Sequence, residues 1–413
     1  MRLRNRLILV GVGVVIFLIA TPLLILYARG FEYDFATHKI VKTGAIVVDT
    51  QPNKASVFVD DKLQKDTTPL SIRFVLPKDY NIRVEKSGYQ NWTKRLSVKS
   101  QFVTWVNQNR DTITLFLTEP NLNRTISADQ TLASQYRDEI AFSNAGQIST
   151  LSVNKGNISN LGSFTSNPVV LPAFPILWEN SNSTFDSLKN HPIVLTKAQL
   201  STIENVETDG NHFIGKIGTD LYSLSPTVSL IDKNVLTYTL DGNSVWYIQG
   251  NFLKRYDFIN NNFETIQTDV PLAESGQIIR ADNYLFAVLD GTLYRINDKL
   301  EKIYGNVSTT DYDSSSAELM FANNNEIFIY HLSDQSTELI LRSSTQIQNP
   351  ILNFSSGYVF YQNEGKIKAI ELDGRDHRNL YTIADAMSNF AVSNDAKFLY
   401  TYNNTTVKEY TIR

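Results

Sequence analysis

The stretch NYLFAVLDGTLYRIN, residues 283–297, has the pattern of a β-hairpin. A run of apolar and aromatic residues leads into the polar turn Leu289-Asp290-Gly291, and a second short run follows. Asp-Gly supplies the left-handed backbone conformations that a tight hairpin turn requires. The stretch therefore predicts two antiparallel strands.

Six similar stretches occur elsewhere in residues 119–413: DEIAFSNAGQISTLSV (138–153), NHFIGKIGTDLYSL (211–224), NSVWYIQGNFLKRYDF (243–258), ELMFANNNEIFIYHL (318–332), GYVFYQNEGKIKAIEL (357–372) and KFLYTYNNTTVKEYTI (397–412). Equivalent positions recur about every 37 residues, and the wider interval from Ile148 to Leu221 predicts a degraded eighth copy near Phe174–Leu188. Repeats of this length made of short strands predict a β-propeller of eight blades over residues 119–413, with seven blades as the close alternative.

A β-solenoid and a multi-strand sandwich are the competing folds for this array. The period is too long for a solenoid coil and too regular for a sandwich. The array lacks the Trp-Asp ending of WD repeats and the paired glycines of kelch repeats. It resembles the TolB-like and quinoprotein-like bacterial propellers, a resemblance of fold that implies no function by itself.

Residues 44–118, upstream of the array, show apolar residues alternating with polar ones in five short runs. Examples are Ile82 and Val84, and the series Ile113, Leu115 and Leu117. Period two with one apolar face is typical of half-buried strands, and no segment of helical period intervenes. We expect a small antiparallel β-sandwich of about 75 residues, near the lower size limit for a single core.

This segment resembles a PEGA domain in the order of its parts: Gly44, Pro52 to Ala55, Val57 to Asp60, Thr68-Pro69, Tyr80 to Lys86 and Gly88-Tyr89. It departs from the family where Asn53-Lys54 replace the signature Glu-Gly, and where Asp61 and Asp79 replace turn glycines. Asn and Asp tolerate left-handed backbone conformations best among the other residues. The resemblance implies an envelope-associated β module without catalysis, common in membrane-anchored bacterial proteins.

The uncharged run from Leu7 to Ala28 is long enough to cross a membrane, which takes about 20 apolar residues. Arg2, Arg4 and Arg6 precede it, so we expect a cytoplasmic stub at residues 1–6, a single-pass transmembrane helix at 7–28 and extracytoplasmic domains. A cleaved signal peptide is the alternative, although its apolar core spans only about 7–15 residues.

Residues 29–43 form a short connector between the helix and the first domain. Its aromatic residues alternate with Glu32 and Asp34, which predicts an extended strand. Two of these aromatics, Phe31 and Tyr33, also suit the membrane interface.

The charge is unevenly distributed along the chain. Residues 44–118 carry 11 Lys or Arg and 7 Asp or Glu, a net charge of +4, and residues 1–43 carry another +4. The total of −4 therefore leaves −12 on residues 119–413. Two solvated surfaces of different average charge would explain this. So would a basic module held close to anionic lipid or cell-wall polymer. Because the large domain is acidic, nucleic-acid binding is not expected.

Motifs for chemistry are absent from the sequence. It has no Cys, which excludes disulfides, thiolate metal sites and a Cys nucleophile, and it has no G-x-S-x-G, G-x-G-x-x-G or P-loop. No two of the five His residues stand at metal-ligand spacing: His38, His191, His212, His331 and His377.

Four further features have structural interpretations. Asp311 to Ser316 resembles an incomplete Ca²⁺ loop and is expected to be an inter-strand loop. Glu371 to Arg375 is expected to be a hairpin turn. Trp92 and Trp105 are expected in the core or at the sandwich edge rather than as ligand-stacking platforms. We therefore predict no catalytic, cofactor-binding or metal-binding residue.

These observations favour a non-catalytic binding or scaffold protein anchored in the cell envelope. Its expected partners are the membrane and either a cell-wall polymer or an envelope protein. The alternative is an extracytoplasmic propeller enzyme, a hydrolase or lyase acting on glycan or peptide, with titratable groups gathered at one mouth of the propeller channel. A sensor that signals through a partner is a third possibility.

Overall fold

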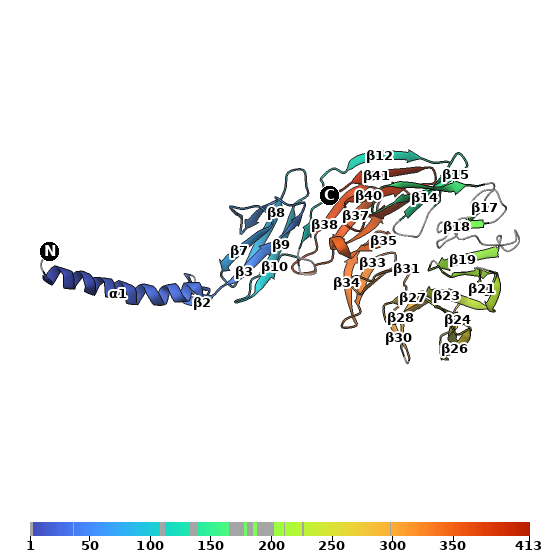
Figure 1. The fold of residues 1–413 in the computed structure, drawn as a ribbon, viewed down its shortest axis with the longest axis horizontal. Helices are drawn as coiled ribbons and strands as arrows, with labels where there is room; N and C mark the ends of the chain where they lie inside the picture. The colour runs from blue at the N-terminus through green and yellow to red at the C-terminus, as the bar shows by residue number, and fades with distance from the viewer. Residues whose placement is uncertain are drawn as a thin grey trace. The chain divides into compact units, whose positions relative to one another are not determined.

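The computed structural model describes residues 3–35, 37–107, 112–132, 139–164, 177–179, 185–187, 202–209, 211–224, 227–297 and 299–413. The chain divides into two compact units. The first comprises residues 1–119, 371–381 and Arg413, and the second comprises residues 120–370 and 382–412. Figure 1 labels their helix and strands.

One helix, α1 (Leu3–Ala28), opens the first unit, close to the expected range 7–28. Its segment Val10–Ala28 is long and apolar enough to cross a membrane, and none of that segment is buried. It contains Pro22, which a membrane-embedded helix tolerates. By length and composition, α1 fits either a membrane anchor or a signal sequence.

The rest of the first unit is a small β-sandwich with a hairpin ahead of it. Its strands are β1 (Phe31–Asp34) with β2 (Lys39–Lys42); β3 (Gly44–Val48) with β7 (Leu70–Val75) and β10 (Val103–Trp105); β5 (Ser56–Val59) with β6 (Lys62–Leu63), β8 (Asp79–Glu85) and β9 (Trp92–Ser97); and β4 (Thr50–Gln51) with β11 (Ile113–Thr114). Side chains of β3, β5, β8 and β9 share one core, which includes Ile46, Val57, Ile82 and Trp92.

Two strand pairs of the sandwich, β10 with β3 and β11 with β4, are parallel. This adds a detail to the expected antiparallel pattern. The chain leaves β9 in one sheet and enters β10 in another, so it does not turn back beside the same strand. Such a crossing between sheets permits a parallel neighbour.

The second unit holds eight sheets among its described residues, seven of four strands and one of two. In chain order they are β12 (Asn121–Ser127) with β39 (Asn389–Val392), β40 (Phe398–Tyr402) and β41 (Thr406–Thr411); β13 (Gln130–Leu132), β14 (Glu139–Asn144), β15 (Gln147–Ser152) and β16 (Ile158–Ser163); β17 (Leu177–Glu179) and β18 (Phe185–Ser187); β19 (Ile203–Thr208), β20 (Phe213–Ile217), β21 (Asp220–Ser223) and β22 (Ser229–Asp232); β23 (Val235–Asp241), β24 (Ser244–Gln249), β25 (Phe252–Asp257) and β26 (Asn262–Gln267); β27 (Gly276–Ala281), β28 (Tyr284–Leu289), β29 (Thr292–Ile296) and β30 (Leu300–Tyr304); β31 (Thr309–Asp313), β32 (Glu318–Ala322), β33 (Glu326–His331) and β34 (Ser336–Arg342); and β35 (Gln348–Asn353), β36 (Tyr358–Asn363), β37 (Lys366–Glu371) and β38 (Leu380–Asp385), with a 3₁₀ turn at Phe354–Ser356.

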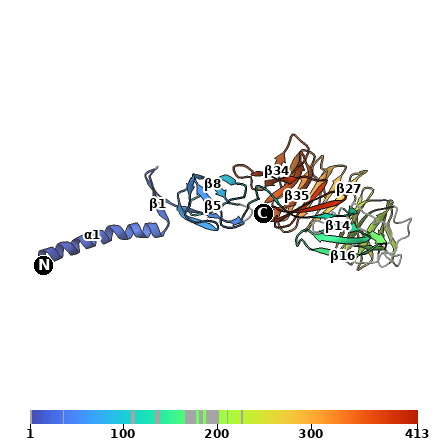
Figure 2. The same cartoon turned by 90° about the horizontal axis from the view of Figure 1, so that it is seen from above.

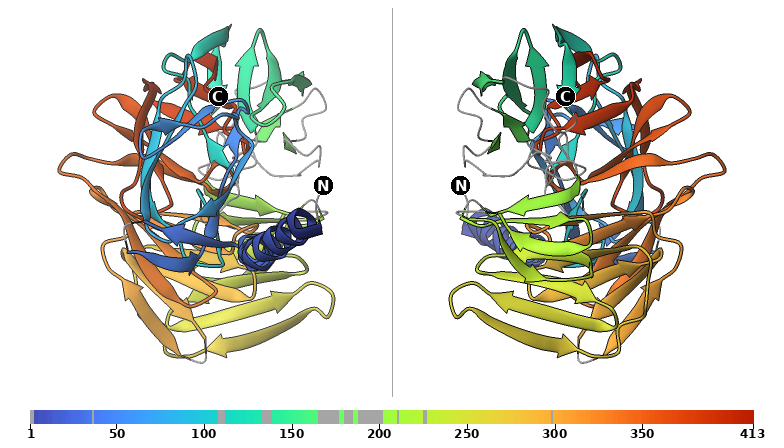
Figure 3. Two further views of the ribbon diagram at one scale, coloured as in Figure 1. Left: turned by 90° about the vertical axis from the view of Figure 1, so that its left-hand side faces the viewer. Right: turned by 90° about the vertical axis from the view of Figure 1, so that its right-hand side faces the viewer.

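Successive sheets of this unit pack against each other through buried apolar side chains. Phe286 of β28 shares a cluster with Phe321 of β32, and Ile140 of β14 shares one with Tyr400 of β40. The sheets follow one another in chain order, as the colours show from two directions (Figures 2 and 3). Strand β12 pairs antiparallel with β41, so strands from the two ends of the array complete one sheet. The unit therefore has the organisation of a β-propeller, and the expected all-β fold class is confirmed.

The repeated hairpins are the two middle strands of their sheets. The stretch 283–297, for example, forms β28 and β29, and its turn residues Asp290 and Gly291 both have positive φ, 43° and 73°. All seven hairpins quoted above are present. Most of the expected eighth copy lies outside the described residues, within which β17 and β18 pair as a two-stranded sheet.

Candidate binding pocket

A polar pocket of about 380 Å³ lies in the second unit, where β31, β35 and β39 begin. Residues of the turn after β32 and of β36 complete the lining. Among the residues that the structure describes, the lining holds seven amide side chains and three hydroxyls, but no ionisable side chain. Such a surface offers hydrogen-bond donors and acceptors without net charge.

A β-bulge shapes one wall of this pocket. The register between β35 and β36 shifts between Gln348 and Ile351, and the two intervening residues are Asn349 and Pro350. Asn349 has φ 48°, a conformation that Asn tolerates, and Pro lacks the N–H that a regular ladder would need. Bulges of this kind redirect side chains, and here the Asn349 Nδ2 donates to Gln362 Oε1 at 3.2 Å.

Internal hydrogen bonds fix the buried amides of the lining. Gln362 is 4% exposed, and its Nε2 donates to the Met387 carbonyl at 3.1 Å. Asn323 accepts hydrogen bonds from the backbone N–H groups of Asn325 and Glu326, both at 2.8 Å. Its Nδ2 donates to the Glu326 carboxylate at 3.0 Å. These amides form a preorganised frame around the pocket.

The same frame keeps a neighbouring carboxylate ionised. The hydrogen bond from Asn323 lowers the pKa of Glu326, and burial, which acts in the opposite direction, is outweighed by further bonds from Tyr304 and Arg342. Glu326 does not line the pocket. Arg342 compensates the charge of Glu326 outside the cavity.

Four other polar side chains of the lining have open hydrogen-bonding groups. The side chains of Thr309, Asn324, Ser388 and Asn389 make no hydrogen bond to any of the residues that the structure describes. Asn324 and Ser388 are exposed, and Thr309 and Asn389 are half-buried. A ligand in the pocket can use these groups without displacing an internal hydrogen bond.

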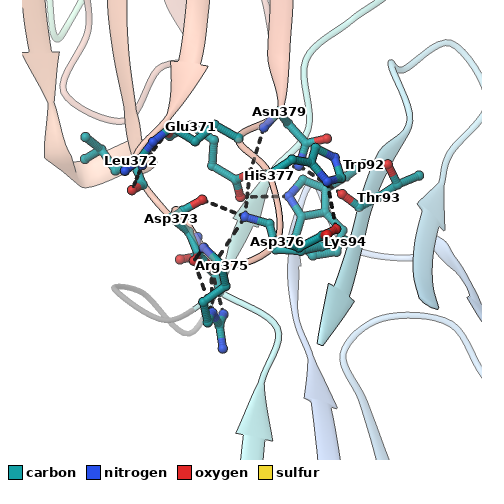
Figure 4. Close-up of polar contacts among 12 residues, drawn as sticks. Trp92, Thr93, Lys94, Glu371, Leu372, Asp373, Arg375, Asp376, His377 and Asn379 are labelled. Atoms are coloured by element: carbon teal, nitrogen blue, oxygen red, sulfur yellow. Dashed lines mark hydrogen bonds and ion pairs between the residues drawn. The ribbon is translucent and has the colours of Figure 1, made fainter. Parts of the chain in front are cut away.

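The first unit contains a second polar cluster, drawn in Figure 4, which is buried and charged. The Lys94 side chain is fully buried, and its Nζ lies 3.0 Å from Glu371 Oε2 and 3.8 Å from Asp373 Oδ2. Trp92 Nε1 donates to Glu371 Oε1 at 2.9 Å, and Asn379 Nδ2 donates to Glu371 Oε2 at 2.8 Å.

Neighbouring backbone groups extend this cluster. Arg375 pairs with Asp373 at 2.7 Å and donates to the carbonyl of Val106 at 3.0 Å. The Lys94 Nζ also donates to the Asp373 carbonyl at 2.7 Å. Since both carboxylates are 2% exposed and are engaged with internal partners, we interpret this cluster as structural.

This cluster corrects the expectation of a hairpin turn at Glu371 to Arg375. Strand β37 ends at Glu371 and β38 begins only at Leu380, so the connection is a longer loop. Asp373 lies in this loop, and its carboxylate is buried beside Lys94 and Arg375.

Asp311 to Asp313 also differs from its expected loop conformation. These residues belong to strand β31, whose register pairs Asp311 with Met320. Only the following serines turn, and Asp313 Oδ1 accepts hydrogen bonds from the backbone of Ser315 and Ser316 at 2.9 and 3.0 Å. The serine-rich turn is thus held by an Asp side chain, and no ion is needed to explain it.

The histidines do not assemble into a site within the described part of the chain. His38 contacts the Tyr33 hydroxyl, and His212, His331 and His377 pair with Asp209, Glu318 and Asp376. None of these four lines the pocket, and no group of three potential metal ligands occurs among the described residues. His191 lies outside them.

The two tryptophans of the sandwich differ. Trp92 is fully buried in the core, and Trp105 is 40% exposed on β10, an outer strand of its sheet, so both lie where core or edge positions were expected. Neither lines the pocket.

Comparison with known proteins identifies one family and several similar folds. Residues 43–112 match the PEGA domain family, which confirms that part of the sequence resemblance. No curated protein sequence matches the chain.

The chain is also similar to solved structures. One is the computationally designed protein Ika8, with 11% identity, TM-score 0.47 and coverage of 69% of this chain and 98% of that one. Another is the WD40 domain of Pan2 from Neurospora crassa, with 9% identity, TM-score 0.41 and coverage of 71% and 95%.

Proposed function

We propose that this protein is a single-pass membrane protein of the bacterial cell envelope whose propeller binds an uncharged, extended segment of a partner protein. The observation that carries the proposal is the pocket beside Asn349, whose described lining offers amides and hydroxyls and no ionisable group. We call it the amide pocket.

The chemistry of the lining favours a peptide. Each peptide unit presents one N–H donor and one C=O acceptor, and a carboxamide side chain such as Asn324 or Asn389 presents the complementary pair. A sugar also offers hydroxyls, but the described residues of the lining include no aromatic side chain on which a sugar ring would stack. A charged ligand would lose hydration without gaining a counter-charge.

The same lining supports binding over catalysis. General acid–base hydrolysis or elimination needs a group that gives or takes a proton, and His, Asp, Glu, Lys and Tyr are the usual ones. None of these lines the amide pocket. A hydrolase or lyase acting on glycan or peptide would have to use another part of the chain.

The N-terminal segment supports the membrane anchor. Arg2, Arg4 and Arg6 precede the uncharged run Leu7–Ala28, and positive residues are retained on the cytoplasmic side. The PEGA domain and the propeller would then lie outside the cell. Because the chain has no Cys, a single Cys placed at Arg413 gives a unique label. We expect an impermeant maleimide to label it in intact cells, and alkaline washing to leave the chain in the membrane. Protection until lysis would contradict the orientation, and release by the wash would indicate cleavage after α1.

Photo-crosslinking in intact cells tests the pocket. The photoreactive residue p-benzoylphenylalanine is placed at Asn324 or Ser388, both exposed at the pocket, and at Asn260, exposed in the turn before β26, as the control. We expect adducts at the first two positions that a protease digests, that are absent at the control and that weaken in the Asn389→Ala background. Adducts that resist protease but are digested by a muramidase would show that the ligand of the pocket is a glycan and not a peptide. Equal labelling at all three positions would refute the pocket.

A further inference from the structure

The hairpin of β1 and β2 has two chemically different faces. Residues that pair directly across an antiparallel ladder share a face, and alternate residues along a strand point to opposite faces. The register pairs Phe31 with Lys42 and Tyr33 with Ile40, which puts these four on one face. Glu32, Asp34, Lys39 and Val41 form the other face. One face is therefore aromatic and cationic, and the other carries both acidic residues.

The aromatic face is open to solvent. Tyr33 is 43% exposed and Ile40 is 53% exposed. Phe35, in the hairpin turn, is 80% exposed and its ring stands edge-on to Tyr33 with centroids 5.0 Å apart. Three large apolar side chains thus lie together, and no described element covers them.

A loop of the sandwich contacts the base of the hairpin. The Gln101 backbone N–H donates to the Thr43 carbonyl at 2.9 Å, and Lys42 Nζ donates to Gln101 Oε1 at 3.0 Å. The next residue, Phe102, is 65% exposed. Lys42 lies 5.4 Å from the Phe31 ring centroid, so a cation lies among the aromatics.

We propose that this surface, defined by Tyr33, Phe35, Ile40 and Phe102 and called here the aromatic collar, is seated in the lipid headgroup layer of the membrane that α1 crosses. The proposal rests on the anchor proposed above. Only Arg29 and Gly30 lie between Ala28 and Phe31, so the hairpin starts at most about 10 Å from the end of the span. The headgroup region is about 6 Å deep on each side of the hydrocarbon core.

Lipid is the occupant that fits this surface best. Aromatic side chains with one polar end concentrate at membrane interfaces, as Tyr does. Arg29, which is exposed at the end of α1, and Lys42 supply positive charge toward lipid phosphates. If α1 spans the membrane, the collar lies beside the headgroup layer whether or not the protein has other partners. The collar would hold the hairpin and the adjoining loop at the bilayer surface and so limit swinging about the anchor.

Site-specific labelling of the full-length protein tests the collar. Single Cys residues replace Phe35 or Phe102, and Leu63→Cys is the matched control, since Leu63 is 62% exposed in the same unit but on another sheet. Each chain carries an environment-sensitive fluorophore and is reconstituted into phosphatidylcholine vesicles containing a minority of phosphatidylglycerol. Thermal unfolding verifies that each labelled chain is folded.

The collar predicts a blue-shifted emission at positions 35 and 102, and quenching by a headgroup-attached nitroxide several-fold stronger than at position 63. Trypsin cleavage after Lys42 should also be several-fold slower in vesicles than in detergent micelles. If the chain floats with the vesicles but positions 35 and 102 respond like position 63, the collar is wrong and the anchor stands. A chain that does not float overturns both proposals.

Discussion

The buried cluster around Lys94 and the amide pocket beside Asn349 use polar side chains in opposite ways. Around Lys94 the side chains are charged, almost fully buried and engaged with internal partners. In the pocket they are neutral, and several have open hydrogen-bonding groups. A buried charge is strongly destabilising unless partners compensate it. A solvent-accessible amide can bond to water when no ligand is bound, so it needs no internal partner. The comparison indicates that one cluster serves stability and the other serves binding.

Breaking the charged cluster should have the largest effect on stability. Lys94→Met leaves Glu371 buried without its cation, whereas Asp373 keeps its pair with Arg375, so the free energy of unfolding should fall by about 3–5 kcal/mol. Urea unfolding of the full-length protein in detergent measures this. Lys78→Met is the control, because the Lys78–Asp60 pair is exposed and such pairs contribute at most about 1 kcal/mol. Equal losses in the two variants would mean that the buried cluster has no special role.

Removing a neutral donor from the same cluster should cost less. Trp92→Phe keeps a buried ring but deletes the N–H that bonds Glu371, a hydrogen bond to a charged group worth about 1.5–3 kcal/mol. The midpoint of urea unfolding should shift in proportion. Combining Trp92→Phe with Lys94→Met should give less than the sum of the two losses, because both residues contact Glu371. Full additivity would show that the two contacts act independently.

Acid should weaken the charged cluster and spare the pocket. Burial acts to raise the pKa of Asp373, but the hydrogen bonds from Arg375 and the charges of Lys94 and Arg375 outweigh it, so the pKa lies below its ordinary value of 3.8. A carboxyl whose pKa is lower in the folded chain contributes stability above its unfolded pKa and loses it as the pH falls through the folded value.

The unfolding free energy of Asp373→Asn should therefore fall less than that of the wild type between about pH 5 and pH 3. Urea titrations at both pH values test this. Asp385→Asn serves as the control, because Asp385 is exposed and its pair with Lys366 should matter little. Parallel losses in wild type and Asp373→Asn would exclude Asp373 as a source of the acid sensitivity.

Pocket substitutions should have the smallest effect on stability. Asn324→Ala and Asn389→Ala remove side chains without internal hydrogen bonds, so the unfolding free energy should change by no more than about 0.5 kcal/mol. Crosslinking at Ser388 should nevertheless fall several-fold. A destabilisation as large as that of Trp92→Phe would place these amides in the framework and erase the distinction between the two regions.

The repeat could be predicted from the sequence because the middle strands of each sheet are the most apolar. Strands β28 and β29 alternate around an Asp-Gly turn, whereas the outer strand β26 is almost entirely exposed and has little periodic signal. The local sequence pattern therefore identifies the middle strands of each sheet and misses the outer ones.

The polar clusters were harder to predict because they join distant residues. The amide pocket draws on residues 308 to 389, and its amides resemble ordinary turn residues in an Asn-rich chain. The usable signal was Asn349-Pro350 inside a strand, which indicates a bulge. In β9, Lys94 shares the buried face of Trp92 and Leu96, and a cation on an apolar face signals a buried partner. Its partners, near residue 371, could not be inferred from local pattern.

The pairing of β12 with β41 also sets an order of events during synthesis. Asn123 and Thr411, joined by a hydrogen bond, are 288 positions apart in the chain. A growing chain makes β12 near the start of the array and must keep its edge unpaired until the last strand emerges. Synthesis that stops early thus leaves a chain with an open edge strand, which can pair with a strand of another chain.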